Sequence, residues 1–186
     1  MKNIEPGYPA AILPGVHDAN EPLIALLEQL ASVVSNLGDA QYVQKPVGVI
    51  ESSIGGHVRH CLDHVRSLLE ATATGQLDYD HRQRGTAIES SRTATAEAVD
   101  QFIDELRTLP EDALDRPLAL RVLLTPDQPP LLVKTSVGRE MAYVVAHTIH
   151  HNALIGAMVK TLGGWLPERF GYAPSTLKHR EAQCAR

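Results

Sequence analysis

Apolar residues recur every three or four positions in four stretches of the chain, the spacing expected for one face of an amphipathic α-helix. The first stretch predicts a helix over Asn20–Leu37, and Gly38 interrupts its pattern. The second predicts a helix that begins at Ser52 or Ser53 and ends at Gly75. Each helix should therefore bury one face in a shared core.

The other two helical stretches lie in the second half of the chain. Thr86 followed by Glu89 fits a capping box and predicts the start of a third helix, which ends before Pro110. The last predicted helix is long, covers Ser136–Leu162 and is followed by two glycines.

A short β-hairpin is predicted between the third and the last helix. Residues 118–124 alternate apolar and other side chains, segment 125–130 predicts a turn, and residues 131–133 can form the return strand. Four amphipathic helices with this insertion predict an all-α fold: a four-helix bundle with a short β-hairpin or extended connection before the last helix.

A length of 186 residues suits a single domain with a hydrophobic core. We expect the core to span about residues 20–162 and the tail, residues 163–186, to be irregular. Trp165 and Phe170 in this tail are expected to fold back and cover one end of the bundle.

Composition and charge exclude several classes of function. Hydrophobic residues make up 44% of the chain and charged residues 21%, as in ordinary globular proteins. A net charge of −5 argues against a protein that binds nucleic-acid phosphates. No apolar run approaches the roughly 18–20 residues that cross a bilayer, and the first residues lack a signal-peptide core. A cytoplasmic protein without a membrane partner is therefore expected.

The two cysteines, Cys61 and Cys184, are too few for a disulfide scaffold and lack the Cys-x-x-Cys spacing of zinc fingers. Cys61 is expected to be a small buried thiol, with a ligand or reactive role as the alternative.

Six of the nine histidines fall in two short segments, one in each of two predicted helices. His57, His60 and His64 are three and then four residues apart, so their side chains share one helical face. His147 and His151 are four residues apart, which lets both imidazoles reach one ion. The spacing therefore favours a divalent-metal site built from both helices.

His150 is a weaker candidate, because helical geometry rotates it by about 100° from its neighbour. The second cluster lies within an apolar run, where imidazoles without partners would be costly. Neutral imidazole is the usual nitrogen ligand of zinc, nickel or iron. The alternative is that these histidines are ordinary core or surface residues that bind no metal.

Two other metal designs do not fit the sequence. A helical metalloprotease needs His-Glu-x-x-His, whereas Thr148, Ile149 and His150 separate the histidines here. A di-iron bundle needs Glu-x-x-His motifs, and the sequence has none. A mononuclear site with histidines from two helices fits better.

With these motifs the sequence resembles the DinB/YfiT-like superfamily of bacterial metal-binding four-helix bundles. The matching segments are Ser52–His64 and Ala146–Ala153, together with the order of helices and hairpin. The resemblance implies a three-histidine site in which His147 and His151 form a pair from the last helix and His60 comes from the second. His57 and His64 on the same face are held in reserve as alternatives to His60.

The resemblance also implies an activity, because characterised relatives include transferases and isomerases that use low-molecular-weight thiols. A zinc or nickel ion, or iron, would then bind the thiol and present it to a small electrophile. Arg59, Arg66 and Arg139 could receive a substrate carboxylate, although surface or ion-pair roles are their alternative. Glu140 could orient an imidazole or act as a base, and simple exposure is its alternative.

The competing prediction is a non-catalytic metal-binding bundle in which the ion only ties two helices together. A homodimer is part of this alternative. The substrate and the reaction are not named by any motif.

Overall fold

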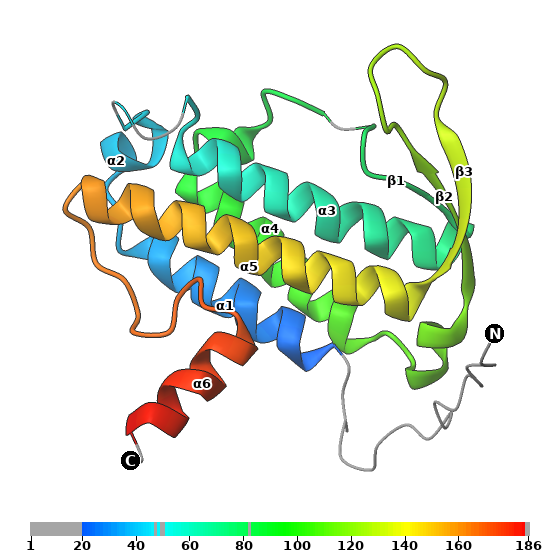
Figure 1. Ribbon diagram of the computed structural model, residues 1–186. Helices are drawn as coiled ribbons and strands as arrows, with labels where there is room; N and C mark the ends of the chain where they lie inside the picture. Colours follow the sequence, from blue (N-terminus) through cyan, green and yellow to red (C-terminus); the bar gives the residue numbers. More distant parts are fainter. Residues whose placement is uncertain (1–19, 47, 49–50, 82, 185–186) are drawn as a thin grey trace.

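The computed structural model describes residues 20–184 except 47, 49, 50 and 82 (Figure 1). The helices within this part of the chain are α1 (Glu21–Ser35), α2 (Asp39–Val43), α3 (Ile54–Thr74), α4 (Arg92–Arg107), α5 (Val137–Thr161) and α6 (Pro174–Cys184). The strands are β1 (Gln76–Asp78), β2 (Pro117–Val122) and β3 (Leu131–Ser136), and two short 3₁₀ turns are η1 (Ala87–Glu89) and η2 (Glu111–Asp115).

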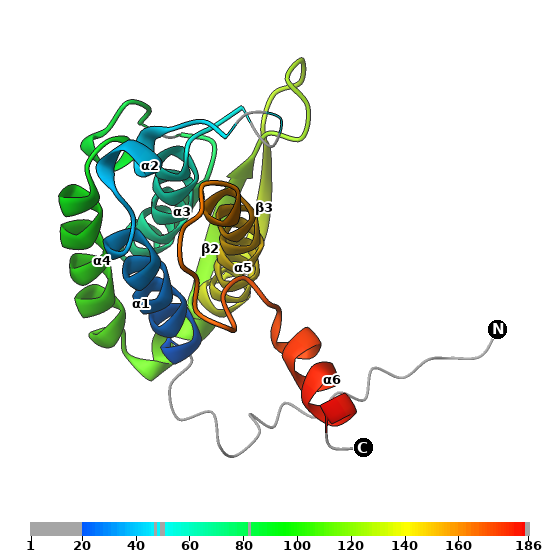
Figure 2. The same cartoon turned by 90° about the vertical axis from the view of Figure 1, so that its left-hand side faces the viewer.

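Helices α1, α3, α4 and α5 lie side by side as a bundle, which confirms the predicted fold (Figures 1 and 2). Their apolar stripes meet in one core, where Leu27, Leu62, Leu106 and Ile155 are fully buried, one from each helix. Each such side chain stabilises the fold by roughly 1.5–3 kcal/mol. Among the described helices, none is long and apolar enough to cross a membrane.

Both ends of α3 follow the sequence signals. The Ser53 hydroxyl accepts a hydrogen bond from the backbone N–H of Gly56 at 3.0 Å, so Ser53 rather than Ser52 caps the helix. Gly75 ends it with a φ of 72°, a left-handed conformation that favours glycine, and its N–H donates to the Ala71 carbonyl at 2.8 Å. These two ends fix where the histidines of α3 lie along the bundle.

A three-stranded sheet lies beside the C-terminal end of α3 and the N-terminal end of α5 (Figure 1). Strands β2 and β3 pair antiparallel with Val122 opposite Leu131, which confirms the predicted hairpin. Strand β1 was not predicted, because three residues are too short to show a pattern. It pairs parallel with β2, and Asp78 lies opposite Arg121 and forms an ion pair with it at 2.7 Å.

The predicted start of the third helix is wrong. Thr86 precedes only the turn η1, and its hydroxyl makes no capping hydrogen bond. Ser91 caps α4 instead, through its side chain. In place of the predicted capping box, the Glu89 carboxylate forms an ion pair with Arg59 and accepts a hydrogen bond from the backbone N–H of Gly85.

The predicted irregular tail is also partly wrong, because α6 forms within it. None of the α6 side chains is buried, so the helix has no apolar stripe that could have revealed it. Phe170 folds back as expected, is 6% exposed and packs on the core. Trp165 does not: it is 53% exposed, because the chain leaves α5 through two glycines and Phe170 supplies the cover.

Helix α2 was not predicted either, because its five residues follow directly on Gly38 and are too few for a stripe. Its Tyr42 is fully buried, donates a hydrogen bond to the Ile88 carbonyl at 2.7 Å and shares a second with Thr95 at 2.7 Å.

Candidate metal centre

The two longest described helices, α3 and α5, run antiparallel beside each other (Figure 1). Histidines of the two helices face each other across this contact. The imidazole of His57 contacts that of His151, and the imidazole of His60 contacts that of His147. Because the helices are antiparallel, one turn forward on α3 matches one turn back on α5. The histidine cluster comprises His57, His60 and His64 from α3 and His147 and His151 from α5.

At the centre of the cluster, Nε2 of His60 and Nε2 of His147 lie 3.0 Å apart. Two imidazole nitrogens at this distance share either a proton or a cation, because two lone pairs would repel. A tetrahedral zinc ion with bonds of 2.0–2.1 Å separates its ligand nitrogens by about 3.3 Å. The spacing of this pair therefore fits two ligands of one ion.

His64 completes a group of three. Its Nδ1 donates a hydrogen bond to the His60 backbone carbonyl at 2.9 Å, since a carbonyl can only accept. In the neutral ring, Nε2 then carries the lone pair. One ligand-capable atom each of His60, His64 and His147 lies within 4.8 Å of the others, and the group could hold a metal ion. The donor set, three imidazoles, suits a divalent transition metal.

His151 lies at the edge of the same group. Its ring centroid is 4.5 Å from that of His60 and 4.6 Å from that of His147, while its Nδ1 faces Nδ1 of His57 at 3.0 Å. Burial and the neighbouring histidines lower the pKa of His151 to about 3, and burial also lowers that of His57. Both rings are therefore neutral at physiological pH, the protonation state that ligation requires.

Each predicted histidine thus has a definite place. The predicted ligands His60, His147 and His151 are brought together, and the reserve residues His57 and His64 lie in the same cluster. Which of them bind the ion stays a prediction. His150 is exposed and meets only the edge of His151, with ring centroids 5.4 Å apart.

Two tyrosines beside the cluster were missed by the sequence reasoning. The ring of Tyr79, just after β1, stacks on His64 with centroids 4.8 Å apart, and Tyr143 stacks on His147 at 5.5 Å. Tyr143 is four residues before His147, so helical spacing could have indicated it. No local pattern could have indicated Tyr79, which is brought in by the pairing of β1 with β2.

Glu140 is buried rather than exposed, with 1% of its side chain accessible. It is linked to the cluster through Tyr79, whose hydroxyl donates to its carboxylate at 3.1 Å. Arg139 is 63% exposed, donates to Glu140 at 3.2 Å and lies over the Tyr143 ring at 5.6 Å. Arg139 therefore contacts two residues beside the histidine cluster, Glu140 and Tyr143.

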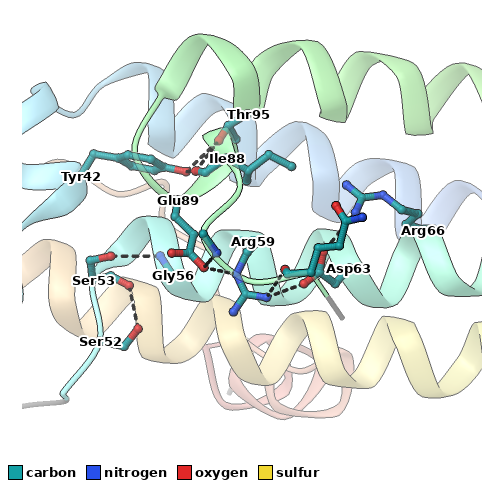
Figure 3. A network of polar contacts seen from close by, with 12 residues as sticks. Tyr42, Ser52, Ser53, Gly56, Arg59, Asp63, Arg66, Ile88, Glu89 and Thr95 are labelled. Atoms are coloured by element: carbon teal, nitrogen blue, oxygen red, sulfur yellow. Dashed lines mark hydrogen bonds and ion pairs between the residues drawn. The ribbon is translucent and has the colours of Figure 1, made fainter. Parts of the chain in front are cut away.

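The other two arginines belong to an ion-pair network that joins α3 to η1 (Figure 3). It comprises Arg59, Asp63, Arg66 and Glu89. Arg59 contacts both acids, and Arg66 contacts Asp63 at 3.4 Å, which confirms the ion-pair alternative for these two arginines. Cys61 is fully buried, as expected, and burial raises the pKa of its thiol.

The protein-family model of the DinB superfamily matches residues 23–155 of the chain. The crystal structure of the DinB-like protein YjoA from Bacillus subtilis has a similar fold, with a TM-score of 0.60, 16% sequence identity, and coverage of 80% of this chain and 95% of that one. A Rhizopus delemar protein named FK506-binding protein 5 is 35% identical over 114 residues, which are 61% of this chain but only 30% of that protein. The chain therefore belongs to the DinB superfamily.

Proposed function

We propose that the protein is a metal-dependent transferase that delivers the sulfur of a low-molecular-weight thiol to a small electrophile. The observation that carries this proposal is the pair formed by His60 and His147, whose Nε2 atoms lie 3.0 Å apart. Both side chains are only partly buried, so a small molecule has a way to the site.

The metal would be zinc or nickel, with iron as a further candidate. His60 and His147 would supply two ligands, and the third would come from His151, four residues along α5, or from His64 on α3. Three protein ligands leave at least one coordination position for a small molecule. The ion, when bound, would lower the pKa of an incoming thiol.

The residues around the cluster can hold the rest of such a thiol. Low-molecular-weight thiols of this kind carry carboxylates, and the exposed guanidinium of Arg139 suits one. A pocket of about 480 Å³ adjoins it, lined by Val133, Lys134 and Thr135 of β3 together with Glu140. Its volume fits a small molecule. These side chains would orient the thiol while the histidines hold the metal.

The test is turnover by untagged protein whose metal content has been measured by elemental analysis. Glutathione, bacillithiol and mycothiol are each supplied with a panel of small electrophiles, and thioether formation is followed. We expect turnover with one thiol, which is lost in His147→Ala. Metal-loaded protein that turns over none of the thiols contradicts the transferase, and protein without stoichiometric metal contradicts the metal centre.

The second candidate is a structural metal site, favoured by the fact that the cluster bridges α3 and α5 at two successive turns. An ion there would tie together the two longest helices of the bundle. This candidate predicts that metal raises the unfolding temperature, whereas no ligand position exchanges with added thiol or azide. A spectral change on adding either molecule to cobalt-loaded protein contradicts it.

A further inference from the structure

Tyr79 lies between the histidine cluster and a buried acid, although it belongs to neither α3 nor α5. It follows β1, whose parallel pairing with β2 carries the chain across the ends of both helices. Its ring faces His64, and its hydroxyl faces Glu140. This position gives Tyr79 contact with both an imidazole of the cluster and the residue that anchors it.

Glu140 is an anchor because its carboxylate is buried and satisfied by donors from three segments. The hydroxyl of Thr135 in β3 donates to Oε1 at 2.8 Å, Arg139 donates to the same oxygen at 3.2 Å, and Tyr79 donates to Oε2 at 3.1 Å. A buried carboxylate without such partners would be strongly unfavourable. The three bonds therefore fix the carboxylate and, with it, the hydroxyl of Tyr79.

The other end of Tyr79 restrains His64. The two rings are nearly parallel, 14° apart, with centroids separated by 4.8 Å. The hydroxyl at the far edge of the Tyr79 ring is held by its hydrogen bond to Glu140. On its other side His64 stacks on His147, at 4.0 Å and 25°. With Nδ1 tied to the His60 carbonyl, the His64 ring is held on both faces and at one edge.

We propose that Tyr79, anchored by Glu140, is a positioning residue that fixes His64 as a ligand of the metal centre. This inference rests on the metal centre of the proposed function and adds the identity of its third ligand. A ligand imidazole that is oriented in advance loses less freedom when the ion binds, and outer partners of this kind commonly change metal affinity by about 10–100-fold.

The test compares three tyrosine-related variants in the full chain. Tyr79→Phe keeps the stacked ring and removes only the hydroxyl, and Glu140→Gln keeps the shape of the anchor and removes its charge. Tyr42→Phe is the matched control, since Tyr42 is also buried and also loses hydrogen bonds, but to Ile88 and Thr95 rather than to Glu140. His64→Gln tests the ligand itself.

Zinc affinity is measured by competition with a chromophoric chelator, and ligand geometry by the visible spectrum of Co²⁺-loaded protein. We expect zinc affinity to fall about 10-fold in Tyr79→Phe and Glu140→Gln and further in His64→Gln, with altered Co²⁺ spectra. Tyr42→Phe should lower only the unfolding temperature of the metal-free protein. The metal-free unfolding temperatures of all four variants reveal any loss of folding.

The outcomes separate two failures. If the original protein binds Zn²⁺ tightly and His64→Gln or Tyr79→Phe leaves both affinity and spectrum unchanged, the positioning role is wrong and the metal centre stands with another third ligand. If Tyr42→Phe weakens zinc as much as Tyr79→Phe, the effect is general destabilisation and the inference is likewise wrong. If the original protein binds neither Zn²⁺ nor Co²⁺, the metal centre itself is refuted.

Discussion

Helix α3 carries two polar groups of opposite character. In the ion-pair network, on the side toward η1, guanidinium groups pair with carboxylates. Asp63 contacts both Arg59 and Arg66 (Figure 3). The histidine cluster, toward α5, sets nitrogen against nitrogen, at 3.0 Å in two separate pairs. One helix thus carries paired opposite charges on one side and imidazole nitrogens, all potential metal ligands, on the other.

The contrast shows how a structural polar group differs from a candidate binding site. Opposite charges satisfy each other, so the network needs nothing from outside the chain. Facing imidazoles satisfy each other only through a shared proton or a cation, and burial keeps at least His57 and His151 neutral. The cluster is therefore the place where a divalent ion has most to contribute.

The largest effect is expected from His147→Ala, which should lower zinc affinity at least 100-fold, or about 2.7 kcal/mol. The change removes one member of the Nε2 pair from the cluster. His150→Ala is the matched control, because this exposed histidine lies on the same helix. Equal affinities of the two variants, measured by chelator competition, would contradict the assignment of the cluster.

The next effect concerns the network: Asp63→Ala should lower the free energy of unfolding by about 2 kcal/mol, because it leaves Arg59 and Arg66 without their shared acid. Zinc affinity should not change. Asp112→Ala removes an exposed ion pair with Arg116 and should cost almost nothing by comparison. Urea denaturation measures the unfolding free energy of both variants. A loss of zinc binding in Asp63→Ala would mean that the ion-pair network and the histidine cluster are not independent.

A pH titration sharpens the electrostatic side of the comparison. The folded state holds the pKa of His151 near 3, whereas the unfolded chain has the ordinary value of about 6.5. Between these values the unfolded state binds more protons, so the metal-free protein should lose up to about 1.4 kcal/mol of stability per pH unit as the pH falls below 6.5. His151→Asn should have a shallower slope. Parallel slopes would mean that His151 is not held neutral.

The smallest effect is expected from Cys61→Ala, because this residue belongs to neither group. Its thiol is fully buried and stays protonated, so it acts as a small apolar side chain. We expect a loss of about 1 kcal/mol in unfolding free energy and an unchanged zinc affinity. A clear loss of zinc affinity would instead indicate that the Cys61 sulfur is a metal ligand.

The sequence predicted the parts of the fold that depend on burial and local capping. The stripes of α1, α3, α4 and α5, and the ends of α3 at Ser53 and Gly75, follow from side-chain periodicity and backbone preferences. Helix α6 and strand β1 were missed because the first buries nothing and the second has only three residues. Neither element therefore shows a periodic pattern of apolar residues in the sequence.

The candidate site divides in the same way. That the histidines of α3 share a face, and that His150 turns away, followed from helical geometry alone. Glu140 was named from its spacing as a residue that could orient an imidazole. Its contact with Tyr79 could not be predicted, because it joins residues 61 positions apart. The choice among His57, His60 and His64 depends on such long-range contacts, which is why spacing left it open.

The exposed position of Trp165 decides which optical signal can follow these experiments. The chain has one tryptophan, and 53% of this residue is already exposed to water in the folded protein. Its emission should therefore change little when the bundle unfolds, and intrinsic fluorescence would understate the transition. Far-ultraviolet circular dichroism reads the helices directly, so ellipticity is the signal with which the stability of these variants should be compared.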